Sequence, residues 1–579
     1  MTRLVNDPRR FAADALHGFV AAHADRVMAT PGGVVRASAG DQGQVAIVLG
    51  GGSGHYPAFA GWVGEGMAHG AVCGNVFASP SASQVYSVVR AADNGGGVLL
   101  GFGNYAGDVL HFGQAAERLR AEGIDVRVLP VTDDVASAPA DMTGLRRGIA
   151  GDLLVFKVAG AAAADGLDLD AVEQAARRAN ERTRSMGAAF SGCTLPGATA
   201  PLFTVPSDVT ALGLGIHGEP GIRDVPLGTA DATADLLVDA VLAEEPPRAE
   251  GGYHGRVALL LNGLGATKHE ELFVVFGRVV ERLAQAGLTV VAPEVGEHVT
   301  SLDMAGLSLS LMFLDDELER WWTAPADTPA LRRVAAQEPR RRELVEQAAD
   351  AATVPGTSES HEWAGRLVGL LEVMAQCALA HEEQLGALDS IAGDGDHGQG
   401  MVLGANGGLR AARRAHAAGA GARTVLIEAG AGWSDAAGGT SGALWGAALT
   451  AVGGALDDSA AASSARVVAA TRAGGQAVTR LGGAVRGDKT MVDALLPFVE
   501  GLEAAHRAGV HLPHAWCAAA SSATQAAQAT ADLAARRGRA RTHGTSSLGH
   551  PDPGATSFAL LMSAIGEALT IDSPTGELP

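Results

Sequence analysis

The sequence is poor in positive charge and especially in lysine. Lysine occurs only at Lys157, Lys268 and Lys489, and arginine supplies the rest of the 43 basic residues, against 64 acidic ones. The formal charge of −21 argues against a nucleic-acid-binding surface, which needs clustered positive charge to displace counterions. An anionic substrate would have to be held by backbone amides, metal ions or local arginines.

Cysteine and long apolar runs are also scarce. The four cysteines are far apart and show no metal-ligand spacing: Cys73, Cys193, Cys377 and Cys517. In a chain of this size they indicate buried thiols in a reducing compartment. The two uncharged stretches of more than about 20 residues are broken by glycine and proline, and the N-terminal residues carry charges. We therefore expect a cytoplasmic protein without a signal peptide or a membrane partner.

Glycine, in contrast, is abundant. The chain has 78 glycines in 579 residues, where average composition gives roughly 40. They follow no collagen-like period, so they indicate loops in which the backbone turns sharply or approaches a ligand closely. The length itself predicts two or three domains.

The first 325 residues have the pattern of an α/β domain with a largely parallel sheet. An amphipathic helix with an acidic cap is expected at 168–184. A stretch rich in proline and glycine suggests two lobes, about 1–195 and 196–325. Short apolar runs predict strands at 44–49, 97–102, 126–131, 152–157, 256–261 and 288–292.

From residue 357 to 579 the sequence predicts an all-α domain of seven or eight helices. A proline-rich linker with a short helix at 340–347 is expected between the domains, at 326–356. Segments rich in alanine and leucine predict helices at 358–385, 400–418, 441–455, 463–480, 490–507, 514–537 and 555–570.

A glycine loop with the sequence GGGSGHYP (50–57) directly follows an expected strand. Its glycines allow a sharp turn that presents backbone amides, and Ser53 and His55 add the donors and acceptors that a polyhydroxy ligand needs. The loop lacks the GKS/GKT of a phosphate loop and the GxGxxG of a dinucleotide site. A tight turn without a ligand is the alternative.

Two further residues of this domain have the setting of a catalytic group. Asp108 follows the strand expected at 97–102, where α/β sheets place ligand groups, and would act as a general base or form an Asx turn. His217 lies in GLGIHGEPG (213–221), where flanking glycines leave its ring accessible for acid, base or nucleophilic chemistry. A structural or solvated histidine is the alternative.

Three carboxylates within eight residues mark the helical region: Asp389, Asp394 and Asp396. They would repel one another unless a cation neutralised them, and oxygen ligands in this number favour Mg²⁺ carried with nucleotide phosphates. A solvated acidic turn is the alternative. Turns rich in glycine, serine and threonine open further helices at 438–442, 487–491 and 550–557. Helix N-termini of this kind suit phosphate oxygens.

Together and in this order, these segments strongly resemble the single-chain, ATP-dependent dihydroxyacetone kinases over nearly the whole chain. The resemblance implies an α/β kinase domain of two lobes with mixed or parallel sheets, followed by an all-α nucleotide-binding helical barrel. It is carried by GGGSGHYPAF (50–59), NYAGD (104–108), RRGIAGDLLVFKVAGAAAADG (146–166), GLGIHGEPG (213–221), LDSIAGDGDHG (388–398), GGTSGALWG (438–446), GDKTMVDALLP (487–497) and GHPDPGATS (549–557).

The resemblance also implies an activity: ATP-dependent phosphorylation of a terminal hydroxyl of dihydroxyacetone or erythrulose by a homodimer. His217 would hold the ketone as a covalent hemiaminal, and Asp108 or His55 would take the proton from the attacking hydroxyl. The substrate would be held by Gly52, Ser53, Gly54, His55 and Asp108. Two Mg²⁺ ions would be bound by Asp389, Asp394 and Asp396. ATP would be bound by His397, Gly398, Gln399, Gly400, Thr440, Ser441, Gly482, Thr490, Met491, Asp552, Pro553 and Gly554.

Two departures from the family pattern concern the sites. Many members have a substrate-contacting lysine where this chain has Gly103, and the roomier pocket suggests that a four-carbon ketose is accepted. The segment 541–548 replaces a stretch common after Gly-Arg-Ala, although Arg539 is retained. Three other activities remain open: a ketone-binding regulator without kinase activity, a kinase with a phosphoprotein donor, and an FAD-AMP lyase side activity.

Overall fold

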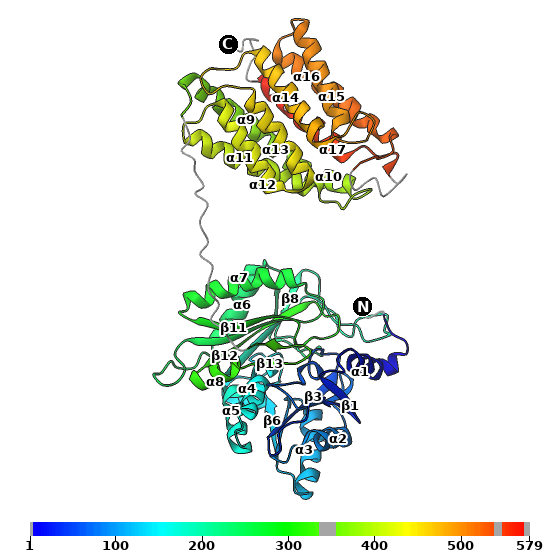
Figure 1. Cartoon of the computed structure of the whole chain (residues 1–579), viewed down its shortest axis with the longest axis vertical. Helices are drawn as coiled ribbons and strands as arrows, with labels where there is room; N and C mark the ends of the chain where they lie inside the picture. The colour runs from blue at the N-terminus through cyan, green and yellow to red at the C-terminus, as the bar shows by residue number, and fades with distance from the viewer. Residues whose placement is uncertain (1–3, 335–354, 538–546, 572–579) are drawn as a thin grey trace. The chain divides into compact units, whose positions relative to one another are not determined.

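The computed structural model describes residues 4–334, 355–537 and 547–571. By its internal contacts the chain divides into two units, Met1–Arg341 and Arg342–Pro579, and each is described by itself (Figure 1). The helix expected at 340–347 lies outside the described residues, as do Arg539 and most of the segment 541–548.

The first sheet of the N-terminal unit brings the glycine loop and Asp108 to one edge. Its strand order is β1-β2-β4-β3-β5-β6, with parallel pairing from β4 to β6 and antiparallel pairing at the β1 edge. The strands are β1 Val27–Thr30, β2 Gly33–Arg36, β3 Ala46–Ser53, β4 Gly70–Val76, β5 Val98–Gly103 and β6 Val126–Val131. The glycine loop ends β3 and Asp108 follows β5, so both lie at the carboxyl edge of neighbouring parallel strands, where α/β sheets bind ligands.

Helices cover both faces of this sheet, which explains its uninterrupted apolar strands. In β3, Ala46 and Val48 pack with α2 and α3, whereas Ile47 and Leu49 pack with α4 and α5. The helices are α1 Phe11–Ala22, α2 Ala82–Ala92, α3 Ala106–Ala121, α4 Asp152–Ala164 and α5 Leu169–Arg182. The amphipathic helix expected at 168–184 is confirmed as α5, with Asp168 as its N-cap.

The strand expected at 152–157 is wrong, because these residues form the first turns of helix α4. Every residue from Asp152 to Ala163 is buried, so the helix is enclosed on all sides and its sequence carries no amphipathic pattern. A short continuous apolar run does not distinguish a buried strand from a buried helix. The correction places Asp152 in the N-terminal turn of a helix.

The second sheet is mostly antiparallel, so the expectation of a largely parallel sheet holds only for the first one. Its order is β11-β10-β12-β7-β8-β9, and β10–β11 is its one parallel pair among the described strands. The strands are β7 Thr183–Ala189, β8 Val209–Leu212, β9 Arg223–Pro226, β10 Arg256–Gly263, β11 Thr289–Gly296 and β12 Gly306–Leu314. Strand β7 already belongs to this sheet although it precedes residue 195.

Alternate residues of β10 face two different cores. Leu259 and Leu261 pack with α6 and α7, whereas Ala258 and Leu260 join the core that also contains α4 and α5. The two sheets therefore share one buried layer. The remaining elements of the unit are α6 Ala230–Leu242, α7 His269–Gln285, α8 Asp316–Thr323, β13 Ala326–Asp327, β14 Arg332–Arg333 and the 3₁₀ turns Pro8–Arg10, Ala60–Trp62 and Ala140–Leu145.

The C-terminal unit is all-helical within its described residues, as predicted, and eight of its nine helices form a closed ring. Helix α9 contacts α11, each helix from α11 to α17 contacts the next, and α17 contacts α9. The helices are α9 Ser358–Ala380, α10 Glu382–Asp389, α11 His397–Ala417, α12 Ala422–Ala437, α13 Gly439–Gly454, α14 Ser464–Gly482, α15 Val492–Arg507, α16 Leu512–Ala529 and α17 Pro553–Ile571, with a 3₁₀ turn at Thr530–Asp532. Sequence reasoning missed α12.

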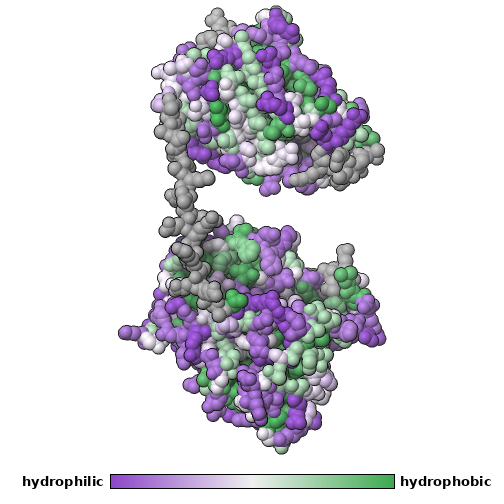
Figure 2. All heavy atoms as spheres, viewed as in Figure 1, coloured by the Kyte–Doolittle hydropathy of each residue, from purple (hydrophilic) through white to green (hydrophobic). Residues whose placement is uncertain are grey.

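Two helices of the ring, α9 and α17, are long and apolar enough to cross a membrane. Both pack against neighbouring helices of the ring, as core helices of folded domains do. The face drawn in Figure 2 mixes hydrophilic and hydrophobic residues on this unit and shows no continuous apolar belt. All four cysteines are free thiols. Cys193 is buried as predicted, whereas the other three are only partly buried.

Candidate active site

A small cavity lies at the carboxyl edge of the first sheet. Its volume is about 150 Å³, which suits a ligand of few atoms. Of the predicted substrate residues, Gly52, His55 and Asp108 line it, together with His217. Three segments that are far apart in the sequence therefore meet around one small space.

Ser53 and Gly54 are not among the lining residues of this cavity. The Ser53 hydroxyl donates to the carbonyl oxygen of Gly74 at 2.6 Å. Gly54 has a φ of +99°, which glycine adopts without strain, and a Cβ there would come within 2.9 Å of the Phe77 ring. The geometry gives both residues a role in the turn that presents His55.

His55 and His217 face each other in the cavity wall, with their Nε2 atoms 3.0 Å apart. Nδ1 of His55 lies 2.7 Å from the Thr300 carbonyl oxygen, and Nδ1 of His217 lies 2.9 Å from a carboxylate oxygen of Glu219. Because both Nδ1 atoms face acceptors, both carry hydrogen. The two Nε2 atoms therefore form a hydrogen bond with each other only when one proton lies between them. Burial and the neighbouring His217 lower the pKa of His55 to about 3.

Glu219 is a site residue that sequence reasoning missed. Its carboxylate accepts hydrogen bonds from Nδ1 and from the backbone N–H of His217, at 2.9 and 3.0 Å. Burial works to raise the pKa of Glu219, but the hydrogen bonds and charge of His217 outweigh it and lower the pKa to about 2. The carboxylate thus orients the imidazole and stabilises positive charge on it. Its place two residues after His217 in the GIHGEPG motif was the available signal.

The loop that carries His217 is fixed by side chains outside the cavity. Arg147 pairs with Asp134 at 2.8 Å and donates to the Gly213 carbonyl oxygen at 3.1 Å. The Ser301 hydroxyl donates to the carbonyl oxygen of Ile216. These bonds hold the imidazole in place before a ligand arrives, and such preorganisation favours catalysis.

Asp108 lies in the first turn of α3 and is 6% exposed. Ser79 hydrogen-bonds to its carboxylate, while Oδ1 has no hydrogen-bond partner among the described residues. Burial raises the pKa of Asp108 to about 6, against the opposing effects of Ser79 and His217. A carboxylate with an open oxygen in the cavity wall is suited to accept a proton from a bound hydroxyl.

Two other polar groups of the cavity wall were not predicted from the sequence. The Tyr105 hydroxyl and Oδ1 of Asp152 are buried without a hydrogen-bond partner among the described residues. Tyr105 also sets its ring edge-on to His217, with 5.1 Å between the ring centres. Tyr105 belongs to the NYAGD motif, which was a signal, whereas Asp152 was placed in the wrongly expected strand.

A second cavity, of about 600 Å³, lies where helices of the C-terminal ring begin. The first residues of α11, α13 and α17, with the residue before α15, line it, so positive helix ends surround it, as phosphate oxygens require. The predicted ATP-binding residues that line it are His397, Gln399, Gly400, Thr440, Ser441, Gly482, Thr490, Met491, Asp552, Pro553 and Gly554.

Gly398 is the predicted ATP-binding residue that is not among the lining residues. A Cβ at this position would lie 2.0 Å from the Glu382 carbonyl oxygen and 3.0 Å from the Gly386 nitrogen. The glycine therefore allows α10 and α11 to pack backbone against backbone.

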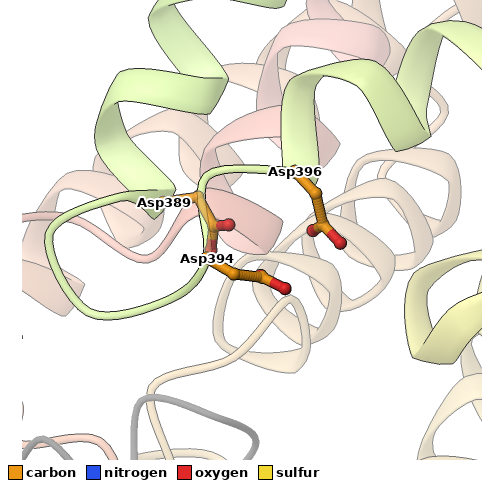
Figure 3. A group of neighbouring side chains, drawn as sticks. All are labelled: Asp389, Asp394 and Asp396. Atoms are coloured by element: carbon orange, nitrogen blue, oxygen red, sulfur yellow. The ribbon is translucent and has the colours of Figure 1, made fainter. Parts of the chain in front are cut away.

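The three predicted metal-binding aspartates lie together at the wall of this second cavity. One carboxylate oxygen of each lies within 4.8 Å of the others. Figure 3 shows Asp389 at the end of α10, and Asp394 and Asp396 on the loop that leads to α11. Asp389 also accepts a hydrogen bond from the Gly395 N–H at 2.9 Å, which closes the loop. Converging carboxylate oxygens are the donor set that Mg²⁺ prefers, so these residues fit the ion.

Lys489 holds the wall of the second cavity together. Its ammonium donates to the carbonyl oxygens of Leu533, Ser547 and His550, at 3.0, 2.5 and 2.8 Å. Burial raises the pKa of the nearby Asp552 to about 7, and the lysine charge opposes this shift. Lys489 is thus a structural cation whose three hydrogen bonds occupy its donors.

The comparisons with known proteins agree with both units. The family model of the Dak1 domain matches residues 17–330, and that of the DAK2 domain matches residues 391–567. The chain is 60% identical to an L-erythrulose 1-kinase of Mycolicibacterium smegmatis over 573 residues, 98% of this chain and 100% of that one. It is 52% identical to a D-erythrulose kinase of the same organism over 582 residues, 99% of each chain.

A solved structure shares both units as well. It is the dihydroxyacetone kinase from C. freundii in complex with AMP-PNP and Mg²⁺, which is 31% identical with a TM-score of 0.59 and covers 98% of this chain and 99% of that one. With a Dak1 unit and a DAK2 unit on one polypeptide, the chain belongs to the single-chain dihydroxyacetone kinase family.

Proposed function

We propose that this kinase transfers a phosphoryl group from ATP to a terminal hydroxyl of a short-chain ketose, with erythrulose preferred over dihydroxyacetone. The observation that carries the proposal is the cavity in which His217, His55 and Asp108 converge. It offers a nucleophile, a proton carrier and a base within a volume of about 150 Å³.

In the proposed capture step, Nε2 of His217 bonds to the carbonyl carbon of the ketose. The proton of the histidine pair passes through His55 to the carbonyl oxygen, which becomes a hydroxyl. The imidazole keeps its Nδ1 hydrogen and a positive charge, which the Glu219 carboxylate stabilises at 2.9 Å. A polyol without a carbonyl has no carbon that accepts this bond, so capture selects ketones.

Asp108 is the proposed base for the hydroxyl that is phosphorylated. His55 already engages Thr300 through Nδ1 and His217 through Nε2, which leaves it the role of proton carrier in capture. Asp108 has an open carboxylate oxygen in the same wall. These contacts support Asp108 rather than His55 as the base, the two residues between which the sequence left the choice open.

Phosphorylation should lose rate below pH 6, because Asp108 works as a carboxylate and burial raises its pKa to about 6. Below this pKa the carboxyl is protonated and accepts no proton, so kcat/KM should fall about tenfold per pH unit. Initial rates at saturating ATP across this range measure the profile. Ser79→Ala removes a hydrogen bond that favours the carboxylate and should move the acidic limb to higher pH. If the acidic limb of the pH profile stays at the same pH in Ser79→Ala and is still present in Asp108→Asn, the titrating group is not Asp108.

The second cavity is the proposed ATP site, and Asp389, Asp394 and Asp396 are the proposed Mg²⁺ ligands. The solved relative was crystallised with AMP-PNP and Mg²⁺, and the residues here supply helix N-termini and three carboxylates. We propose two ions, because three carboxylates carry more charge than one Mg²⁺ neutralises. Bound with ATP, Mg²⁺ neutralises charge that develops on the transferring phosphoryl group.

The substrate preference is tested by comparing ketoses under one set of conditions. We expect kcat/KM for L-erythrulose to exceed that for dihydroxyacetone by about tenfold or more, as one added group in a fitted pocket does. The L enantiomer is expected to be preferred, because the 60% identical relative is named for it. ADP release coupled to NADH oxidation measures each rate, with glycerol as the carbonyl-free control. An enzyme that turns over only the triose would refute the proposed substrate.

A further inference from the structure

Gly103 and Asp152 face each other in the wall of the ketose cavity. A Cβ on Gly103 would lie 3.4 Å from Oδ2 of Asp152, 3.1 Å from the Gly148 carbonyl oxygen and 3.4 Å from the Tyr105 ring. Any side chain at position 103 would therefore meet the Asp152 carboxyl group. Because Gly103 has no side chain, the carboxyl group of Asp152 forms the cavity wall at this point.

The hydrogen bonds among the described residues do not account for the burial of Asp152. It is 3% exposed, and its Oδ1 lacks a hydrogen-bond partner among the described residues. Its buried neighbour Asp133 differs, because it accepts the backbone N–H groups of Ile149 and Gly151, both at 2.9 Å. A buried polar atom left unpaired is destabilising and calls for an explanation such as a ligand.

The general base of the reaction is not the explanation for Asp152. Asp108, at the start of α3, has the open oxygen and the Ser79 contact that suit that task. Burial, Asp133 and Asp108 all raise the pKa of Asp152 well above its usual range, which favours the protonated form of its carboxyl group. A protonated carboxyl group both donates and accepts a hydrogen bond, as a sugar hydroxyl does.

We propose that Asp152 is a specificity-determining residue that hydrogen-bonds the terminal hydroxymethyl group by which a four-carbon ketose exceeds a triose, in the space that Gly103 leaves open. The proposal rests on the proposed function, since it names the contact by which that site selects its substrate. Oδ2 of Asp152 lies beside the space at Gly103, and Oδ1 of the same carboxyl group lacks a hydrogen-bond partner among the described residues. The Asp152 carboxyl group therefore has the capacity to bind the additional hydroxyl.

The test combines variants of Asp152 with a substrate analogue that lacks the terminal hydroxyl group. Wild-type enzyme, Asp152→Ala and Asp152→Asn are assayed with L-erythrulose and with the 4-deoxy analogue of the same configuration at C3, with dihydroxyacetone as reference. In the wild type, kcat/KM should be about 30-fold lower for the deoxy analogue, the effect of one hydrogen bond to a carboxyl group. In Asp152→Ala this penalty should fall below about threefold, and the preference for erythrulose over dihydroxyacetone should drop about 30-fold.

Asp152→Asn retains a donor and an acceptor, so it should keep most of the penalty and most of the preference. A penalty that is unchanged in Asp152→Ala would overturn the proposal, and so would an equal loss for all three substrates, which is the mark of a structural role. Wild-type enzyme without erythrulose turnover would instead refute the proposed function. Wild-type preference for erythrulose with no change in Asp152→Ala would refute this inference alone.

A second variant covers the case in which Asp152→Ala does not fold. Gly103→Ser adds a side chain that points at Asp152 without changing the carboxyl group, and Gly103 has no positive φ that requires glycine. The preference for erythrulose over dihydroxyacetone should fall about tenfold, because the added atoms occupy the space of the hydroxymethyl group. An unchanged preference in a folded Gly103→Ser enzyme would place that group elsewhere and overturn the proposal.

Discussion

Replacement of His217 by alanine should lower kcat/KM for a ketose by about 10³-fold or more. In the proposed mechanism, covalent capture would fix the ketose beside the base, and removal of the nucleophile would abolish this positioning. Rates from the coupled assay give the loss. A ketose labelled with ¹³C at C2 gives an independent readout, because the carbonyl signal should become that of a tetrahedral carbon in the wild type and stay a carbonyl in His217→Ala.

The matched control is His254→Ala, an exposed histidine of the same unit. It should leave both the rate and the labelled carbon signal unchanged. Glu219→Gln should give an intermediate loss of about 10- to 100-fold, because the imidazole loses its charged partner and keeps its nucleophilic atom. A tetrahedral signal that persists in His217→Ala would show that another group captures the ketone.

Replacement of Asp394 by alanine should lower kcat by about 10³-fold while ketone capture continues. The variant removes one of three carboxylates that lie within 4.8 Å of one another, and phosphoryl transfer depends on the metal they would hold. Every lining residue of the small cavity that contains His217 belongs to the N-terminal unit, so the tetrahedral ¹³C signal should remain. The Mg²⁺ concentration that gives half of the maximal rate should also be higher in the variant.

Asp435→Ala is the matched control, because Asp435 is an exposed aspartate of α12 that is not among the lining residues of the second cavity. It should retain wild-type rates. A normal rate in Asp394→Ala would remove the metal assignment. Wild-type protein that captures the ketone and turns over no ATP would instead favour a ketone-binding regulator.

Helices with one apolar face were predictable, and enclosed or glycine-rich ones were not. Helix α5 was found because it is amphipathic and has Asp168 as its cap. Helix α12 was missed because Gly430 and Gly432 interrupt its apolar pattern. The structure explains them: a Cβ on Gly430 would lie 2.6 Å from the Gly446 carbonyl oxygen, and one on Gly432 2.7 Å from that of Gly407. These glycines permit close helix packing, which a sequence pattern does not distinguish from a loop.

Local sequence motifs identified several residues of the site, but they did not predict where the side chains of these residues point. His55 and His217 were singled out by glycine-rich surroundings and Asp108 by its place after an expected strand, and all three line the cavity. Ser53 has the same kind of surroundings, yet its hydroxyl turns to a backbone carbonyl. Asp152 was overlooked because its importance depends on burial and on an unpaired oxygen, which arise only when distant segments pack.

The three hydrogen bonds of Lys489 have a consequence for the variability of the chain. Leu533 precedes residues 538–546 and Ser547 follows them, and one ammonium holds both. The ends of this segment are therefore tethered at a common point, and the entropy of closing a loop between fixed ends grows only slowly with its length. We therefore expect the described part of the cavity wall to accommodate insertions, deletions and changes of composition between these ends. The unusual sequence at 541–548 is thus compatible with an intact nucleotide site.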